Sequence, residues 1–366
     1  MRLVCFECGR SYSVEEKRWR CDCGGFLNLE YDEVNLNFSL NSHLPGLWKY
    51  KHLLPIKDDN SIVSFGEGFT PLIKEHILGK DVYLKLEYLF PSGSYKDRGS
   101  TVLLSKIREL GIGEIVEDSS GNAGSSIAMY AAKAGIKANI YVPKETSKDK
   151  LTQILAFGSN LVIVDGNRND TYIKALRDVE KKGLYYASHA WNPYFFEGTK
   201  TFSFEVFEQL GFAVPDVLII PVGNGTLLIG AYIGFLQLKE AGTIKRIPKI
   251  IAVQSENCPA VYSRINGASE SKCLETVAEG IAISKPVRMK QITQIINDNN
   301  GDVVIVKERE VVEALKLMLK RGLYIEPTSA VVIAALKNIK TNGQVVVLPL
   351  TGSGLKAGKK IEKILV

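Results

Sequence analysis

The feature that most constrains the fold is a regular alternation of short apolar strands with helices of roughly ten residues. The first series predicts strands at 114–118, 138–142, 160–164 and 184–187, with helices at 125–134, 148–157 and 170–182. After a helix at 199–210, the second series predicts strands at 216–221, 250–253, 303–306 and 344–350, with helices near 226–240, 308–321 and 328–338. Such alternation is typical of parallel βαβ units. The sequence therefore predicts two α/β domains, with ligands at the loops that follow strands.

Length and charge limit the classes of function. The 366 residues are 45% hydrophobic and 23% charged, which suffices for about two domains with buried cores. The net charge of 46 − 40 = +6 comes without a long basic block, which favours a small anionic ligand over nucleic acid. The first residues lack an apolar leader core, and no apolar run reaches the roughly 18 residues of a membrane span. We therefore expect a cytoplasmic protein whose partner is a small-molecule substrate.

Four cysteines within the first 23 residues form two pairs, and each pair is followed by glycine: Cys5, Cys8, Cys21 and Cys23. This arrangement favours a tetrahedral zinc knuckle, with reduced thiols in a small lobe as the alternative. The basic residues of this segment are balanced by acidic ones, so it has no net basic face for nucleic acid. The two remaining cysteines, Cys258 and Cys273, are interpreted as structural.

Lys96 is the candidate for the chemistry. It lies in the turn 91–99, which is rich in Gly and Ser, between an expected strand at 82–87 and an expected helix at 100–110. A lysine amine is nucleophilic only when unprotonated, and the turn hydroxyls and the neighbouring cation Arg98 favour that form. Lys96 would then form a Schiff base with an aldehyde cofactor. The alternative is a solvated charge run at the start of a helix.

Three further loops follow predicted strands. In Ser119–Ser126 the backbone N–H groups suit a carboxylate, and the Asn122 amide suits a ring hydroxyl. In Thr351–Gly354 the side-chain hydroxyls suit a ring nitrogen. Each loop is also consistent with an ordinary Gly/Ser turn. The third loop presents N–H donors at a helix start and suits a phosphate; its residues are Gly223, Asn224, Gly225, Thr226 and Leu227.

In this order, the motifs resemble those of the fold-type II pyridoxal-phosphate-dependent enzymes, and within them the threonine synthases. The likeness also includes the cysteine knuckle and the stretch 65–72, Phe-Gly-Glu-Gly-Phe-Thr-Pro-Leu. It implies that Lys96 holds the cofactor, Asn122 contacts its 3′-oxygen, residues 223–227 bind its phosphate and Thr351 bonds its pyridine nitrogen. It also implies a homodimer.

The expected organisation combines an α/β body of parallel sheets flanked by helices with a small zinc-ribbon-like lobe. The lobe comprises residues 1–34. The large cofactor-binding domain comprises 35–80 and 196–366, and the smaller α/β domain comprises 81–195.

The resemblance implies conversion of O-phospho-L-homoserine and water to L-threonine and phosphate, by γ-elimination and β-addition. The neutral hydroxyl of Thr351 is consistent with this, because it makes the cofactor ring a gentler electron sink than a carboxylate does. One segment departs from the family pattern. Where threonine synthases carry Asn-Ser-x-Asn-Pro-x-Arg to hold the substrate phosphate, this chain has Ala190 at the serine position and Phe195 at the arginine position, with His189 first.

The departure keeps other functions open. A phenyl ring offers none of the charge-assisted hydrogen bonds with which arginine binds phosphate. The first alternative is therefore a pyridoxal-phosphate-dependent serine/threonine ammonia-lyase or β-replacement enzyme that acts on an unphosphorylated amino acid. A zinc-ribbon binding protein with an inactive α/β body is a third hypothesis, and the intact Lys96 and phosphate loop argue against it. His189 partly substitutes for the arginine or is a satisfied structural residue.

Overall fold

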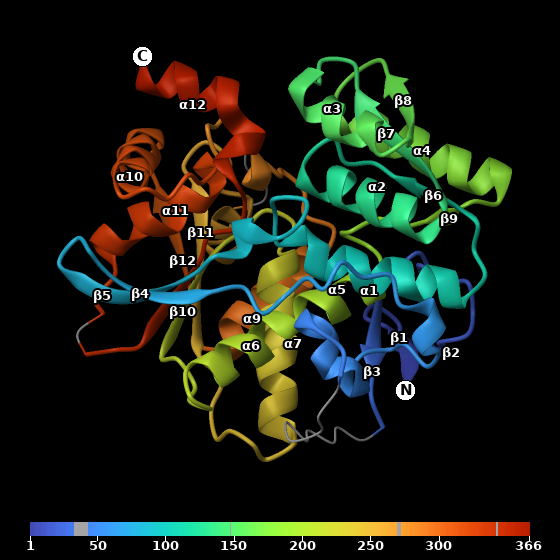
Figure 1. Cartoon of the computed structure of the whole chain (residues 1–366), viewed down its shortest axis with the longest axis horizontal. Coiled ribbons are helices and arrows are strands. Elements are labelled where there is room, and N and C mark those ends of the chain that lie inside the picture. The colour runs from blue at the N-terminus through green and yellow to red at the C-terminus, as the bar shows by residue number, and fades with distance from the viewer. Residues whose placement is uncertain (33–42, 147, 269–271, 342) are drawn as a thin grey trace. The chain divides into compact units, whose positions relative to one another are not determined.

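The structure is a computed structural model that describes residues 1–32, 43–146, 148–268, 272–341 and 343–366 (Figure 1). The chain forms two compact units. The first comprises Met1–Gly68 and Lys96–Thr199, and the second comprises Phe69–Tyr95 and Lys200–Val366. Among the described residues, every helix is too short or too polar to cross a lipid bilayer.

These units divide the chain at residues that differ from the expected domain boundaries. Residues 43–68 belong to the first unit, where Trp48 Nε1 donates to Thr101 Oγ1 at 3.0 Å. Residues 81–95 belong to the second unit, because their strand pairs with a strand near residue 348. The expected boundary between residues 34 and 35 lies outside the described residues.

The N-terminal segment forms a small antiparallel sheet in the order β2-β1-β3. Leu3 and Leu27 are fully buried in its core. Alternation of side chains across such a strand buries one face and leaves the other polar. The bounds are Arg2–Cys5 (β1), Ser11–Ser13 (β2) and Leu27–Glu30 (β3).

The rest of the first unit is built on a parallel sheet in the order β8-β7-β6-β9, as the first predicted series requires. Its strands are Glu114–Glu117 (β6), Lys137–Pro143 (β7), Asn160–Val164 (β8) and Tyr185–Tyr186 (β9). Its helices are Lys96–Glu109 (α1), Asn122–Ala134 (α2), Lys148–Ala156 (α3), Arg168–Lys182 (α4) and Pro193–Thr199 (α5). Three of these helices begin before their predicted starts: α1 at Lys96, α2 at Asn122 and α4 at Arg168.

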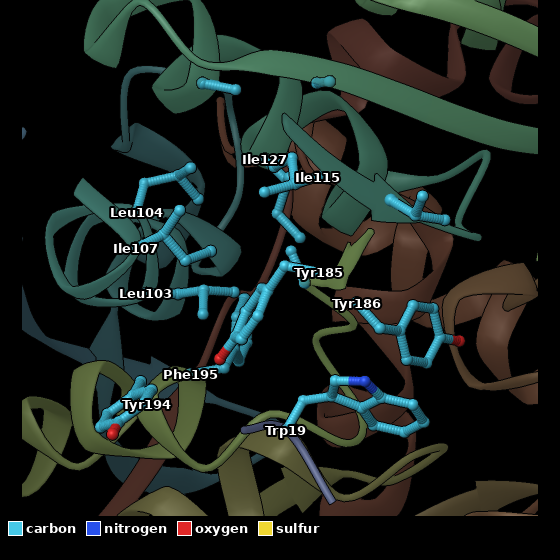
Figure 2. Packing of buried hydrophobic residues seen from close by; sticks show 14 of the residues in the cluster. Trp19, Leu103, Leu104, Ile107, Ile115, Ile127, Tyr185, Tyr186, Tyr194 and Phe195 are labelled. Carbon is cyan, nitrogen blue, oxygen red and sulfur yellow. The ribbon is translucent and has the colours of Figure 1, made fainter. Parts of the chain in front are cut away.

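The core of the first unit joins the cysteine lobe to the α/β body. Trp19 packs edge-on against Tyr186, with ring centroids 4.9 Å apart. Figure 2 shows Trp19 and Tyr186 together with Leu103 of α1 and Phe195 of α5, all of which belong to one buried cluster.

The second unit contains a six-stranded sheet in the order β12-β11-β10-β13-β5-β4. The pairs are parallel except for the β4–β5 hairpin, which the expectation of parallel sheets did not include. The strands are Leu72–Ile77 (β4), Lys80–Lys85 (β5), Val217–Pro221 (β10), Lys249–Ser255 (β11), Asp302–Val306 (β12) and Val346–Pro349 (β13).

The helices of the second unit supply the remaining core. Side chains of α10 and α11 share one buried cluster with β5, β10, β11 and β13. Three helices, α8, α9 and α12, were not predicted. The bounds are Thr201–Gln209 (α6), Thr226–Glu240 (α7), Ala260–Ile265 (α8), Met289–Asp298 (α9), Glu308–Lys320 (α10), Pro327–Ala335 (α11) and Gly358–Leu365 (α12).

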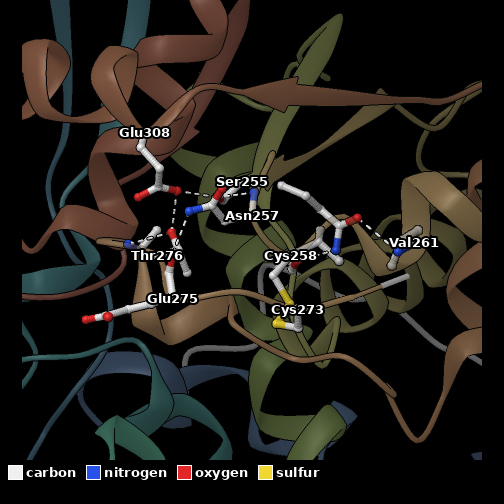
Figure 3. The surroundings of a disulfide bond; sticks show 11 residues. Ser255, Asn257, Cys258, Val261, Cys273, Glu275, Thr276 and Glu308 are labelled. Carbon is white, nitrogen blue, oxygen red and sulfur yellow. Dashed lines mark hydrogen bonds between the residues drawn. A yellow bond between two sulfur atoms is a disulfide. The ribbon is translucent and has the colours of Figure 1, made fainter. Parts of the chain in front are cut away.

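A disulfide joins Cys258 and Cys273 in the second unit (Figure 3). The segment after Cys273 is fixed by Glu308, whose carboxylate accepts hydrogen bonds from the Thr276 hydroxyl and the Val277 N–H, both at 2.7 Å. The two cysteines are therefore structural residues, because they link two segments of the second unit through a disulfide bond.

Candidate active site

Lys96 is the first residue of α1 and is half-buried. The next residue, Asp97, accepts a hydrogen bond from the Ser126 hydroxyl of α2 at 2.5 Å. Ser126 also lies 2.7 Å from the Ser100 hydroxyl. These buried contacts fix the first turn of α1 against α2, and with it the main chain of Lys96.

Asn122 is the first residue of α2, directly after the loop that leaves the carboxyl end of β6. Gly124 lets this loop fold onto the helix, because a Cβ atom there would lie 1.8 Å from the Ser119 carbonyl oxygen. Asp97 and Ser126 link the first turns of α1 and α2, so the first unit brings Lys96 and Asn122 to neighbouring helix starts.

Glu117 and His189 form a buried pair at the same edge of the sheet. His189 Nδ1 lies 2.7 Å from Glu117 Oε1, and both side chains are at most 5% exposed. Burial, followed by the positive charges of Lys96 and Arg168, lowers the pKa of His189 well below its ordinary value. Burial and the neighbouring Asp118 raise the pKa of Glu117. Both shifts favour the uncharged forms of the two side chains, which share this buried hydrogen bond.

Phe195, at the position where the resemblance implies an arginine, is a core residue. Its side chain is fully buried, and a Cβ atom added to Gly99 would lie 2.4 Å from the ring. Its ring centroid lies 6.0 Å from that of His189. Ala190, at the serine position, is also buried. The apolar residue at 195 thus fits tightly against the first turns of α1.

The loop 223–227 lies in the second unit and leads from β10 into α7. Gly225 precedes the helix with a φ of 72°, a left-handed conformation that favours glycine. A Cβ atom at Gly223 would lie 2.9 Å from the Ile281 Cα atom. The first N–H groups of a helix have no acceptor within that helix, so this glycine-lined helix start suits a phosphate. The loop therefore fits the anionic tail of pyridoxal phosphate.

Thr351 follows β13 and is buried. Its hydroxyl lies 3.2 Å from the Ser329 hydroxyl of α11, and Ser329 also accepts from the Gly352 N–H at 3.0 Å. Ser329 therefore orients the Thr351 loop. A neutral hydroxyl in this setting fits the ring nitrogen of the cofactor.

Tyr95 connects these two loops of the second unit. Its hydroxyl lies 2.7 Å from the Thr226 hydroxyl, and its backbone N–H donates to the Thr351 carbonyl oxygen at 3.1 Å. Lys96 follows Tyr95 directly in the chain, and consecutive Cα atoms lie about 3.8 Å apart. The predicted residues are divided between the units: Lys96 and Asn122 are in the first, and the phosphate loop and Thr351 are in the second.

The four N-terminal cysteines lie together, with all their sulfur atoms within 4.8 Å of one another. Cys5 and Cys23 sulfurs are 3.5 Å apart, and those of Cys8 and Cys21 are 3.6 Å apart. Sulfur atoms around a tetrahedral zinc, with Zn–S bonds of about 2.3 Å, are separated by about 3.8 Å. Gly25 lies close against them, because a Cβ atom there would be 2.9 Å from the Cys5 sulfur. The donor set therefore fits zinc.

Sequence reasoning missed four residues of the site: Tyr95, Glu117, Arg168 and Ser329. Two of them could have been noticed in the sequence, because Tyr95 adjoins Lys96 and Glu117 is next to last in a predicted strand. Ser329 lies in a helix of small residues, and Arg168 adjoins a predicted helix. For these two, only the fold reveals the contacts.

The fold and these loops define the class of enzyme to which the protein belongs. Residues 63–352 match the family of pyridoxal-phosphate dependent enzymes. A serine racemase structure from maize superimposes with a TM-score of 0.68 at 21% identity, covering 81% of this chain and 92% of that one. A serine racemase from Dictyostelium discoideum superimposes with a TM-score of 0.66 at 25% identity, covering 78% and 92%. The architecture is that of the fold-type II enzymes.

Sequence relatives narrow the class. A threonine synthase from Methanocaldococcus jannaschii is 35% identical over 96% of this chain and 92% of its own length. A threonine synthase from Synechocystis is 35% identical over 84% of this chain and 82% of its own length. The chain therefore belongs to the threonine synthase family of pyridoxal-phosphate-dependent lyases.

Proposed function

We propose that the protein converts O-phospho-L-homoserine and water to L-threonine and phosphate, with Lys96 as the catalytic amine. The observation that carries the proposal is the pair of contacts made by Tyr95, which adjoins Lys96 and bonds to both the phosphate loop at Thr226 and the Thr351 loop. Membership of the threonine synthase family supports the same substrate.

In this proposal each site residue has one task. Pyridoxal phosphate supplies an aldehyde that links to amines and a ring that accepts electrons from the attached carbon. The N–H groups of residues 223–227 hold its phosphate, Thr351 bonds its ring nitrogen and Asn122 contacts its 3′-oxygen. Lys96 Nζ moves protons at Cα and Cβ of the substrate. Phosphate leaves from Cγ, which takes up a proton to become the methyl group. Water adds its hydroxyl at Cβ, and its second proton balances the one that the released phosphate takes up.

The direct test is an assay of the purified holoenzyme with O-phospho-L-homoserine. We expect threonine and inorganic phosphate in equal amounts, and loss of both with Lys96→Ala. Lys133→Ala is the control, because it removes another lysine of the first unit. The Lys133 side chain is exposed and packs over the Phe65 ring, with its amine 4.4 Å from the ring centroid. Holoenzyme that carries cofactor but releases neither product would refute the proposed reaction.

A second function has its own supporting observation. Phe195 and Ala190 are both buried and offer no charge to a substrate phosphate. This favours an ammonia-lyase or β-replacement enzyme that acts on an unphosphorylated amino acid. Release of a 2-oxo acid and ammonia from serine or threonine, faster than any release of threonine from O-phosphohomoserine, would establish this function instead.

The proposal includes a structural zinc ion held by Cys5, Cys8, Cys21 and Cys23. Its support is the close grouping of four sulfur atoms and the presence of Gly25 against them. We expect one zinc per chain by elemental analysis of protein purified without chelator. Cys8→Ser is expected to remove the zinc, and Cys258→Ser to retain it. Zinc-free wild-type protein with unchanged folding would refute this part.

The proposal also retains the homodimer that the resemblance implies and the cytoplasmic location that the sequence led us to expect. Light scattering of the purified holoenzyme tests the first, with about twice the chain mass of 40.4 kDa expected. A single-chain mass at assay concentration would contradict it.

A further inference from the structure

Under the proposed function, the substrate carries a phosphate that needs a cationic partner. In this chain the family's arginine is replaced by Phe195, which is fully buried against Gly99. An apolar core position cannot hold a dianion. The partner must therefore come from another element at the carboxyl edge of the same sheet.

Arg168 lies at that edge. It is the first residue of α4, which follows β8, and the parallel strands β6 and β8 end at the same edge. A capping box fixes its main chain: the Asn167 side chain accepts from the Asn169 N–H at 2.7 Å, and Asp170 accepts from the Asn167 N–H at 2.8 Å. The arginine is thus presented from a rigid helix start.

The guanidinium reaches the end of β6. Arg168 Nη1 donates to the Asp118 carbonyl oxygen at 3.3 Å, and Nη2 lies 4.0 Å from Asp118 Oδ2. This is a loose ion pair, and 42% of the arginine side chain is exposed to solvent. A guanidinium has five N–H donors in a planar fork, so these contacts leave donors for a bound anion.

The electrostatic surroundings connect Arg168 with Lys96. The positive charges of both residues act on the buried His189. Two buried carboxyl groups, those of Glu117 and Asp118, also lie at this end of β6. Burial raises the pKa of Glu117, which favours its uncharged form, and Asp118 Oδ1 accepts a hydrogen bond from the Tyr186 hydroxyl at 2.8 Å. An anion that approaches Lys96 along this edge therefore meets Arg168.

We propose that the Arg168 guanidinium binds the phosphate group of the substrate, in place of the arginine that Phe195 has replaced. This contact of Arg168 determines the preference of the enzyme for a phosphorylated amino acid. The inference rests on the proposed function, and it assigns the phosphate contact to α4 and not to α5.

Three variants test it. Arg168→Gln removes the charge, and Arg168→Lys keeps the charge without the fork. Arg177→Gln removes the same charge from an exposed position on the same helix, about 13 Å further along its axis. Each holoenzyme is assayed with O-phospho-L-homoserine, and the two products, inorganic phosphate and L-threonine, serve as competitive inhibitors. Cofactor content and unfolding midpoint are measured for each variant.

For Arg168→Gln we expect the KM for O-phospho-L-homoserine and the inhibition constant of phosphate to rise roughly 10- to 100-fold. The inhibition constant of L-threonine is expected to change less than twofold. Arg168→Lys is expected to fall between Arg168→Gln and wild type, and Arg177→Gln to match wild type.

Two outcomes overturn the inference. Equal increases for phosphate and L-threonine would show that Arg168 acts on the amino-acid part or on the fold. Unchanged constants in an active Arg168→Gln enzyme would show that it does not bind substrate. Wild-type enzyme that makes no threonine is a different result, because it refutes the proposed function itself.

Discussion

Gly225 offers a sharp test of the phosphate loop, because Gly211 provides a control with the same positive φ. Both glycines have a φ of 72°. A Cβ atom at Gly225 would lie 2.5 Å from Ile292 Cδ1, whereas at Gly211 it would meet no described atom within 4 Å. The two alanine variants therefore share the backbone strain and differ in the steric conflict at the loop.

The magnitudes follow from these contacts. An alanine in the left-handed region costs about 1–2 kcal/mol, which both variants incur. At Gly225 the buried Ile292 must also shift, and overpacking of a core costs about 1–3 kcal/mol more. We expect Gly211→Ala to lose about 1–2 kcal/mol of unfolding free energy and Gly225→Ala about 2–5 kcal/mol.

The affinity for the cofactor is the second quantity to measure. Displacement of the loop tilts the N–H groups that we assign to the phosphate, so Gly225→Ala is expected to raise the dissociation constant of pyridoxal phosphate at least about tenfold. Gly211→Ala is expected to leave it unchanged. Apoenzyme of each variant is titrated with cofactor and followed by absorbance. Equal cofactor affinity in the two variants would refute the assignment of the phosphate to residues 223–227.

Three further predictions concern the rest of the fold. The pKa of His189 is lowered in the folded state, so its contribution to stability is complete above pH 6.5 and is lost as pH falls below that value, by at most about 1.4 kcal/mol per pH unit. Urea unfolding from pH 7 to pH 5 is expected to show a smaller pH slope in His189→Gln, and identical slopes would contradict the prediction. Cys258→Ser opens a disulfide between residues 15 apart and is expected to lower the unfolding free energy by about 3 kcal/mol in oxidised protein, with no change in protein already reduced by a dithiol. Phe195→Arg restores the family residue but buries a charge against α1, so we expect a loss of about 3–5 kcal/mol and no gain in activity. A stable, more active Phe195→Arg enzyme would show that this position still faces the substrate.

Much of the α/β architecture could be predicted from periodicity. Strands such as β6 and β10 combine apolar runs with flanking turns, and their predicted and observed bounds agree within about a residue. Helix α1 begins four residues before its predicted start at residue 100, because the polar stretch Lys96-Asp97-Arg98 is typical of a loop. In the structure this polar turn is buried against α2, with Asp97 bonded to Ser126.

Other elements depend on tertiary context. The α9 helix buries Ile292, Ile295 and Ile296, a three-to-four spacing that was available in the sequence but stands among polar residues. The β4 strand pairs with β5 in an antiparallel hairpin, so the alternation of strands and helices did not predict it. The contact of Phe195 with Gly99 joins residues 96 positions apart and follows only from the packing of α5 on α1.

The central claim is that Lys96 carries the cofactor. Reduction of the holoenzyme with borohydride fixes the cofactor to the lysine that holds it, and peptide mass spectrometry then locates the label. We predict a phosphopyridoxyl group on Lys96, in the peptide that also contains Tyr95, and no such label in Lys96→Ala. A label on another lysine of the wild-type protein would contradict the account.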